Sequence, residues 1–148
     1  MIGITSDHRG FELKKSIIDY LEKNNIEVSD LGTYTPESVD YPTYALNLAR
    51  QVRDGDFKFG IAICGTGIGM TIAANKVKGV YAALCNNLED VRLARTHNNA
   101  NILALSARTN FEEAKEMALN FISTEFVGHD RHEKRIDIIK EYENKVYK

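Results

Sequence analysis

Short apolar runs alternate along this chain with longer segments in which apolar residues recur every three or four positions. The short runs cover residues 2–5, 26–28, 59–63, 80–84 and 102–105. The segments with helical spacing cover residues 11–23, 43–54, about 68–76, 87–97, 111–124 and about 130–146. Buried strands that are separated by amphipathic helices are typical of a parallel sheet with helices on both faces. The sequence therefore predicts an α/β fold with five parallel strands.

Length and composition fit one domain with its own core, which we expect to span residues 1–148. The chain is 43% hydrophobic and 27% charged, as is usual for a globular protein. Its net charge of −2 favours neither nucleic acid nor an anionic membrane as a partner, so any anion site must be local. No window approaches the roughly 18 apolar residues of a membrane span. The N-terminal residues do not resemble a signal peptide, and the two cysteines lie in apolar segments, which suits a reducing compartment. We therefore expect a cytoplasmic location.

A glycine-rich loop follows the third predicted strand. Gly65, Gly67 and Gly69 allow the backbone to turn sharply and to approach a ligand closely. Their amides would precede a helix, where they could bind a phosphate or an oxyanion. The spacing matches neither the dinucleotide fingerprint nor a P-loop. Taken alone, the loop suits a simple strand-to-helix turn equally well.

Cys64 immediately precedes this loop, and a helix N-terminus would favour its thiolate form. A thiolate can act as a nucleophile or as a base. The alternative is a buried structural thiol, because cysteine is among the most buried residue types. That alternative fits Cys85 better, since no glycine lies beside it. For Cys64 the neighbouring loop favours a functional role.

Basic residues on the last predicted helix form a second candidate group. Arg131 and Arg135 lie four positions apart and share a face, which suits a phosphate, although a solvated surface would be the ordinary role. His129 and His132 lack a carboxylate or thiolate at a metal-ligand spacing. We therefore expect no metal site and place both histidines at the surface.

Reactive side chains also gather near the ends of predicted strands. Asp7 could merely cap the first helix, and His97 could merely cap the end of another. In parallel sheets, ligands bind beyond the carboxyl ends of strands, where Asp7, His8, Cys64 and Arg108 are expected. The gathering of so many reactive groups favours one site over several separate structural roles.

Six motifs in one register resemble the type B ribose-5-phosphate isomerases. They are Asp7-His8, Asp40-Tyr41-Pro42, residues 64–69, Ala73-Ala74-Asn75-Lys76, His97-Asn98 and Arg131-x-x-x-Arg135. The match extends almost from end to end. It implies a three-layer α/β/α Rossmann-like sandwich that forms homodimers or tetramers, with sites shared between two subunits and with no metal or cofactor. The wider group also contains allose-6-phosphate isomerases and galactose-6-phosphate isomerase subunits.

The resemblance also implies a role for each matched residue. Cys64 matches the base that moves a proton between C1 and C2, Thr66 assists it, and His97 matches the acid that opens the sugar ring. The anion hole for the enediolate matches the amides of Gly65, Gly67, Ile68 and Gly69. The sugar contacts match Asp7, Tyr41 and Asn98, and the phosphate contacts match His8, Arg108, Arg131 and Arg135.

Three positions separate this chain from other members. Met70 stands where another branch has a glutamate base, so the chain resembles the cysteine branch. Arg9 follows His8 where small or apolar residues are common, and it could alter the mouth of the pocket. Thr5 replaces a frequent glycine.

The predicted function is metal-independent interconversion of ribose 5-phosphate and ribulose 5-phosphate. Allose 6-phosphate or another aldose 6-phosphate is the alternative substrate. A sugar-phosphate-binding module without turnover would need only the arginines, so the presence of Cys64, His97 and Asp7 argues against it. A cysteine-dependent phosphatase would place an arginine within the loop at 65–69, which has none.

Overall fold

Five parallel strands form the central sheet of the computed structural model, which describes residues 1–147. They are β1 (Ile2–Ser6), β2 (Val28–Asp30), β3 (Phe59–Cys64), β4 (Ala82–Leu84) and β5 (Ile102–Ser106), in the order β2-β1-β3-β5-β4. The predicted parallel sheet is confirmed. Two strands begin two residues later than predicted, because Ile26 donates its amide to Leu21 at the end of a helix and Tyr81 donates its amide to a side chain.

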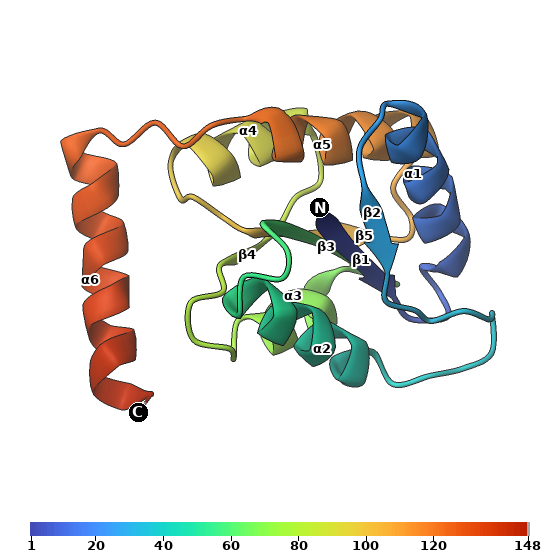
Figure 1. Cartoon of the computed structure of the whole chain (residues 1–148), viewed down its shortest axis with the longest axis horizontal. Coiled ribbons are helices and arrows are strands. Elements are labelled where there is room, and N and C mark those ends of the chain that lie inside the picture. Colours follow the sequence, from blue (N-terminus) through green and yellow to red (C-terminus); the bar gives the residue numbers. More distant parts are fainter. Residues whose placement is uncertain (148) are drawn as a thin grey trace.

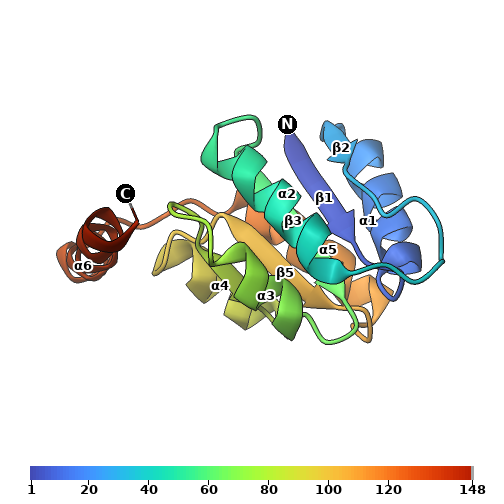
Figure 2. The ribbon, with the colours of Figure 1, turned by 90° about the horizontal axis from the view of Figure 1, so that it is seen from below.

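Six helices accompany the sheet, as predicted. They are α1 (Phe11–Lys23), α2 (Tyr41–Arg53), α3 (Ile68–Ala74), α4 (Leu88–Thr96), α5 (Phe111–Ser123) and α6 (Asp130–Val146). Helices α1, α4 and α5 cover one face of the sheet and α2 and α3 cover the other, which gives the expected three layers (Figures 1 and 2). Among the described residues, no helix is both long and apolar enough to cross a membrane.

The alternating side chains of β3 divide the core into two clusters. Ile61 and Ile63 pack against α1 and α5, whereas Ala62 and Cys64 pack against α2 and α3. Because both faces of the strand are buried, each isoleucine contributes roughly 1.5–3 kcal/mol to the stability of the fold. The same alternation directs the Cys64 side chain toward the layer that contains α3.

Strand β4 lies at one edge of the sheet, and side chains complete its hydrogen bonding. The amide group of Asn75 bonds to both backbone groups of Ala82, accepting from its N–H at 2.8 Å and donating to its carbonyl at 3.0 Å. Asn101 in the same way accepts the Tyr81 amide at 2.8 Å and donates to the Gly79 carbonyl at 3.0 Å. Asn75 thereby closes the outer edge of β4, and Asn101 fixes the turn that precedes this strand.

Helix α6 stands apart from the layers, beyond β4 (Figure 1). Glu143 ties it to the core by accepting the amide of Gly79 at 2.8 Å and the hydroxyl of Tyr81 at 2.5 Å. Ile136 is the buried apolar contact of this helix. Its other large apolar side chains, Ile138, Ile139, Tyr142 and Val146, are exposed.

Candidate active site

The carboxyl ends of β1, β3 and β5 meet and bring three predicted residues to one edge of the sheet. Asp7 donates its amide to the carbonyl of Ile63, and Ala107 donates its amide to the carbonyl of Cys64. Asp7 therefore follows β1, Cys64 ends the neighbouring strand β3, and Arg108 comes directly after Ala107. We call this edge, with the loop at residues 65–69, the thiol half-site.

Cys64 is buried, and its sulfur accepts the amide of Gly67 at 3.2 Å. An N–H group that points at sulfur stabilises negative charge on it. Thr66 lies in the same loop, and its hydroxyl oxygen accepts the amide of Ile68 at 3.2 Å, which leaves the hydroxyl proton free to be donated. The loop therefore supplies a thiol, a hydroxyl group and backbone amides within one turn of chain.

Ser106 orders this loop, a role that the sequence analysis missed. Its hydroxyl donates to the carbonyl of Gly65 at 2.8 Å and accepts the amide of Arg108 at 3.1 Å. The available signal was its position at the end of the fifth strand, two residues before the predicted phosphate ligand Arg108.

Gly67 adopts a φ of +80°, and a Cβ there would lie 2.5 Å from Leu84 Cδ1 and 3.0 Å from the backbone of Leu105. We expect Gly67→Ala to suffer both backbone strain, about 1–2 kcal/mol, and overpacking, about 1–3 kcal/mol. Gly79 is the matched control, because its φ is +86° but nothing lies within 4 Å of the added Cβ. Urea denaturation should show a larger loss of unfolding free energy for Gly67→Ala than for Gly79→Ala. Equal losses would contradict the predicted contact.

Asp7 and His8 have specific partners at the start of α1. One carboxylate oxygen of Asp7 accepts the amides of Arg9 and Gly10, at 2.9 and 3.1 Å. Asp7 thus closes the turn before the helix, whose N-cap residue is Gly10. His8 accepts the amide of Val39 at Nδ1, 3.2 Å away, so the proton of the neutral ring lies on Nε2 and is available to an anion.

Two further side chains border the loop. The ring of Tyr41 lies on Gly69, because a Cβ at Gly69 would be 2.5 Å from two ring carbons. Arg9 lies over Gly65 and, with Ala107 and Arg108, lines a hollow of about 370 Å³. Arg9 therefore occupies the mouth of the thiol half-site, as the sequence suggested.

A neighbouring groove of about 520 Å³ continues from Arg108. It is lined by Thr66, Ile68, Leu84, Asn86, Ser106, Arg108, Thr109, Asn110 and Glu113. The groove thus connects the predicted proton-shuttling hydroxyl with a predicted phosphate ligand.

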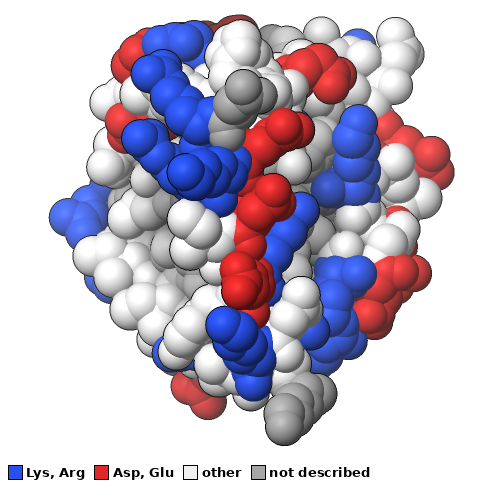
Figure 3. Space-filling model, turned by 90° about the vertical axis from the view of Figure 1, so that its left-hand side faces the viewer, with Lys and Arg blue, Asp and Glu red and all other residues white. Residues whose placement is uncertain are grey.

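The remaining predicted residues lie at the opposite edge of the sheet, where the strands begin. His97 and Asn98 follow α4 and precede β5, so they lie at the amino end of that strand. Arg131 and Arg135 are exposed on the first turns of α6. Figure 3, which faces α6, shows Lys and Arg side chains gathered at the end where this helix begins. We call these four residues the histidine half-site.

The expectation that all reactive groups gather in one place is therefore wrong for a single chain. Residues that precede a parallel strand and residues that follow one lie at opposite edges of the sheet. Both kinds of position are strand ends in the sequence, which does not show at which edge each one lies. The chain joins Asp7, His8, Cys64 and Arg108, but it keeps His97 away from them.

His132 also differs from its expected place on the surface. It is buried, and its ring stacks on that of His97 with centroids 4.2 Å apart and planes inclined by 17°. Burial lowers the pKa of His132, and the positive charges of His97, Arg131 and Arg135 act in the same direction. The neutral imidazole that results provides a flat support for the His97 ring.

Cys85, by contrast, fits the structural role expected for it. It is buried in the cluster beneath α1 and α4. Burial, reinforced by the charge of Asp90, raises the pKa of the Cys85 thiol to about 12. The thiol is therefore protonated at neutral pH and unsuited to act as a base.

Comparison with known proteins decides which family this arrangement represents. Residues 2–139 match the family model described as Ribose/Galactose Isomerase. The chain belongs to this family. Its ribose/galactose isomerase fold superposes on a ribose 5-phosphate isomerase from Thermotoga maritima with a TM-score of 0.91, at 50% identity over 95% of this chain and 97% of the other.

Two other relatives within the ribose/galactose isomerase family are ribose-5-phosphate isomerases of type B. The chain is 39% identical to ribose-5-phosphate isomerase B of Escherichia coli over 97% of both proteins. A Mycoplasma genitalium ribose-5-phosphate isomerase B, solved with bound ribulose-5-phosphate, gives a TM-score of 0.92 at 44% identity, covering 98% of this chain and 97% of that one. The resemblance found in the sequence is thus confirmed, and the protein is an isomerase.

Proposed function

We propose that this protein interconverts ribose 5-phosphate and ribulose 5-phosphate, with Cys64 as the base. The hydrogen bond from the Gly67 amide to the Cys64 sulfur carries the proposal, because it stabilises a thiolate beside further loop amides. The relative that binds ribulose-5-phosphate supports this choice of substrate. Allose 6-phosphate is the alternative that the family leaves open.

The reaction begins with the ring-closed sugar. His97 donates a proton to the ring oxygen while the C1 hydroxyl loses its proton, so the ring opens to the free aldehyde. Cys64 then removes the proton from C2, and the electron pair of that C–H bond forms a C1–C2 double bond as O1 becomes an oxyanion. Return of the proton to C1, with the O2 proton passing to O1 through Thr66, gives the ketose.

Loop amides stabilise the charge that develops on the enediolate. Residues 65–67 precede α3 and residues 68 and 69 begin its first turn, where backbone amides have no acceptor within the helix. Two of these amides, those of Gly67 and Ile68, bond to the side chains of Cys64 and Thr66. Preorganised donors of this kind contribute a few kcal/mol to transition-state stabilisation. Asp7, Tyr41 and Asn98 would orient the hydroxyl groups of the sugar, so that C2 faces the sulfur.

Two copies of the chain form each complete site in this proposal. The thiol half-site and the histidine half-site occupy opposite edges of one sheet, so a second copy must supply the missing half. Large apolar side chains are exposed on α3 and α6, including Ile68, Ile72, Ile139 and Tyr142, and they offer a surface for this copy. A two-fold symmetric homodimer would contain two equivalent sites.

Arg131 and Arg135 would clamp the substrate phosphate, together with His8 and Arg108 from the other copy. We expect Arg131→Ala and Arg135→Ala each to raise KM for ribose 5-phosphate at least about tenfold, which is roughly 1.4 kcal/mol of binding. Steady-state kinetics tests this. Lys134→Ala is the control, because it removes a charge from the same exposed turn without removing a predicted ligand. Unchanged KM in both arginine variants would place the phosphate elsewhere.

The direct test is a coupled assay with ribose 5-phosphate and allose 6-phosphate as separate substrates. The proposal expects a higher kcat/KM with ribose 5-phosphate. A preference for allose 6-phosphate would reassign the substrate, and binding of both sugars without turnover would favour the binding module.

A further inference from the structure

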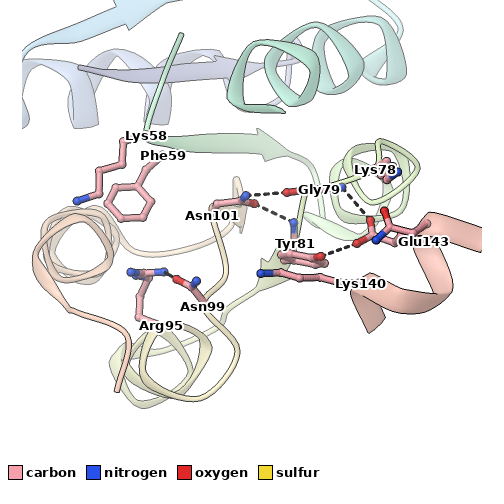
Figure 4. A pocket seen from close by; sticks show the side chains of 11 residues that line it. Lys58, Phe59, Lys78, Gly79, Tyr81, Arg95, Asn99, Asn101, Lys140 and Glu143 are labelled. Atoms are coloured by element: carbon pink, nitrogen blue, oxygen red, sulfur yellow. Dashed lines mark hydrogen bonds between the residues drawn. The ribbon is translucent and has the colours of Figure 1, made fainter. Parts of the chain in front are cut away.

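A pocket at the amino edge of the sheet is separate from both half-sites. Its volume is about 460 Å³, within the range of small-molecule sites. It lies between α6 and the starts of β3 and β5 (Figure 4). It is lined by Lys58, Phe59, Lys78, Gly79, Tyr81, Arg95, Asn99, Asn101, Lys140, Glu143 and Asn144, none of which is a predicted catalytic or substrate-binding residue.

Arg95 is the unusual member of this lining, because a buried guanidinium normally has a carboxylate partner. Only 4% of the residue is exposed. Its side chain donates to the carbonyls of Thr124 and Ala100 and to the side chain of Asn99, and its guanidinium carbon lies 4.6 Å from the centre of the Phe59 ring. Across the described residues, no carboxylate lies within 4 Å of it. The positive charge, which arginine cannot lose, is thus held in place by neutral hydrogen-bond acceptors, and the charge of Glu125 acts on it without a direct ion pair.

Two lysines add to this charge. Lys140 extends from α6, and in Figure 4 its amine end points toward the side of the pocket where Arg95 and Asn99 lie. Lys58 holds its amine 5.3 Å from the centre of the Phe59 ring. Among the side chains that the structure describes, no carboxylate lies within 4 Å of either lysine. The acid in the pocket, Glu143, already accepts two hydrogen bonds from the core.

Asn99 adds a hydrogen-bond donor to these positive charges. It adopts a φ of +50°, an uncommon conformation for a residue other than glycine, and so places its side-chain oxygen 2.9 Å from an Arg95 nitrogen. With that oxygen engaged, the free group of the side chain is its NH₂ donor. The lining therefore presents hydrogen-bond donors and four basic side chains against one carboxylate, that of Glu143.

We propose that this pocket binds a small phosphate-bearing anion, held by Arg95, Lys58, Lys140 and the amide of Asn99. The anion would supply a directly bonded counter-charge, which no described carboxylate gives Arg95. This site is distinct from the proposed phosphate clamp, because none of His8, Arg108, Arg131 and Arg135 lines the pocket.

Pyrophosphate is the probe, and binding is followed by NMR signals of side chains that line the pocket. In NMR titrations of the uniformly ¹⁵N-labelled protein, the Arg95 Nε–H and the Asn99 side-chain amide should shift and saturate. Lys58→Ala/Lys140→Ala should weaken this binding at least tenfold. Lys145→Ala should leave it unchanged, since Lys145 pairs with Glu141 on the same helix and does not line the pocket. Neutral ribose should cause no shift at these positions.

Three results would overturn the inference. They are the absence of saturable shifts at Arg95 and Asn99, undiminished affinity in the double variant, and shifts confined to the two half-sites. None of these results depends on turnover, so they leave the proposed isomerase reaction to its own assay.

Discussion

Cys64→Ala should lower kcat for ribose 5-phosphate by about 10²–10⁴-fold, because the proposed base for the C2 proton is lost. KM should change little, since the proposed phosphate ligands remain. The side chain is small and its sulfur accepts one hydrogen bond, so the fold should tolerate alanine. Steady-state kinetics, with circular dichroism to verify folding, provides the measurement.

Cys85→Ala is the matched control, because it removes the other buried thiol of the chain. Its kcat should stay close to that of the unaltered protein, since a thiol whose pKa is raised to about 12 is not a base at neutral pH. Retention of more than about one-tenth of kcat by Cys64→Ala would exclude that thiol as the general base.

Combining two inactive chains should restore activity. Cys64→Ala lacks the proposed base and His97→Asn lacks the proposed ring-opening acid, so each variant alone should lose about 10²-fold or more of kcat. In a heterodimer of the two, one site combines the intact Cys64 with the intact His97 and the other site lacks both. Heterodimers purified through two different tags should therefore show about half the activity of the unaltered dimer.

The same heterodimer separates the shared site from a site within one chain. If Cys64 and His97 of the same chain acted together, neither chain would hold an intact pair, and the heterodimer would be no more active than its parents. A heterodimer of one unaltered chain and one Cys64→Ala chain is the control, and it should also show about half activity. It verifies that the tags and the purification preserve turnover.

The order of elements could be predicted from periodicity, because both faces of β1, β3 and β5 are buried and their sequences are almost wholly apolar. The first residues of the short edge strands β2 and β4 were harder to predict. Ile26 has the character of a strand residue, yet its amide completes the last turn of α1. Val80 likewise forms a turn with Val77 before β4 begins. These starts depend on local hydrogen bonds that an apolar pattern does not contain.

The residues of the site could be predicted from the sequence, but their separation into two half-sites could not. Cys64 and the glycine loop are contiguous in the sequence, so their proximity could be predicted directly. The separation of His97 from Cys64 follows from the direction in which each strand runs, and it becomes visible only when the sheet is assembled. His132 was assigned to the surface because a charged helix gives no local sign that one of its positions faces the end of α4.

Asn75 has a consequence for how this chain can associate. A strand at the border of a sheet usually offers a row of unpaired backbone groups on which another strand can add, and this is a common route to aggregation. Here the border strand β4 has only three residues, and the Asn75 amide occupies both backbone groups of Ala82 as a neighbouring peptide would. Sheet extension from this side is blocked by a single side chain. On this side of the sheet, contacts between copies are therefore directed to helical surfaces, where shape rather than a repeating backbone ladder selects the partner.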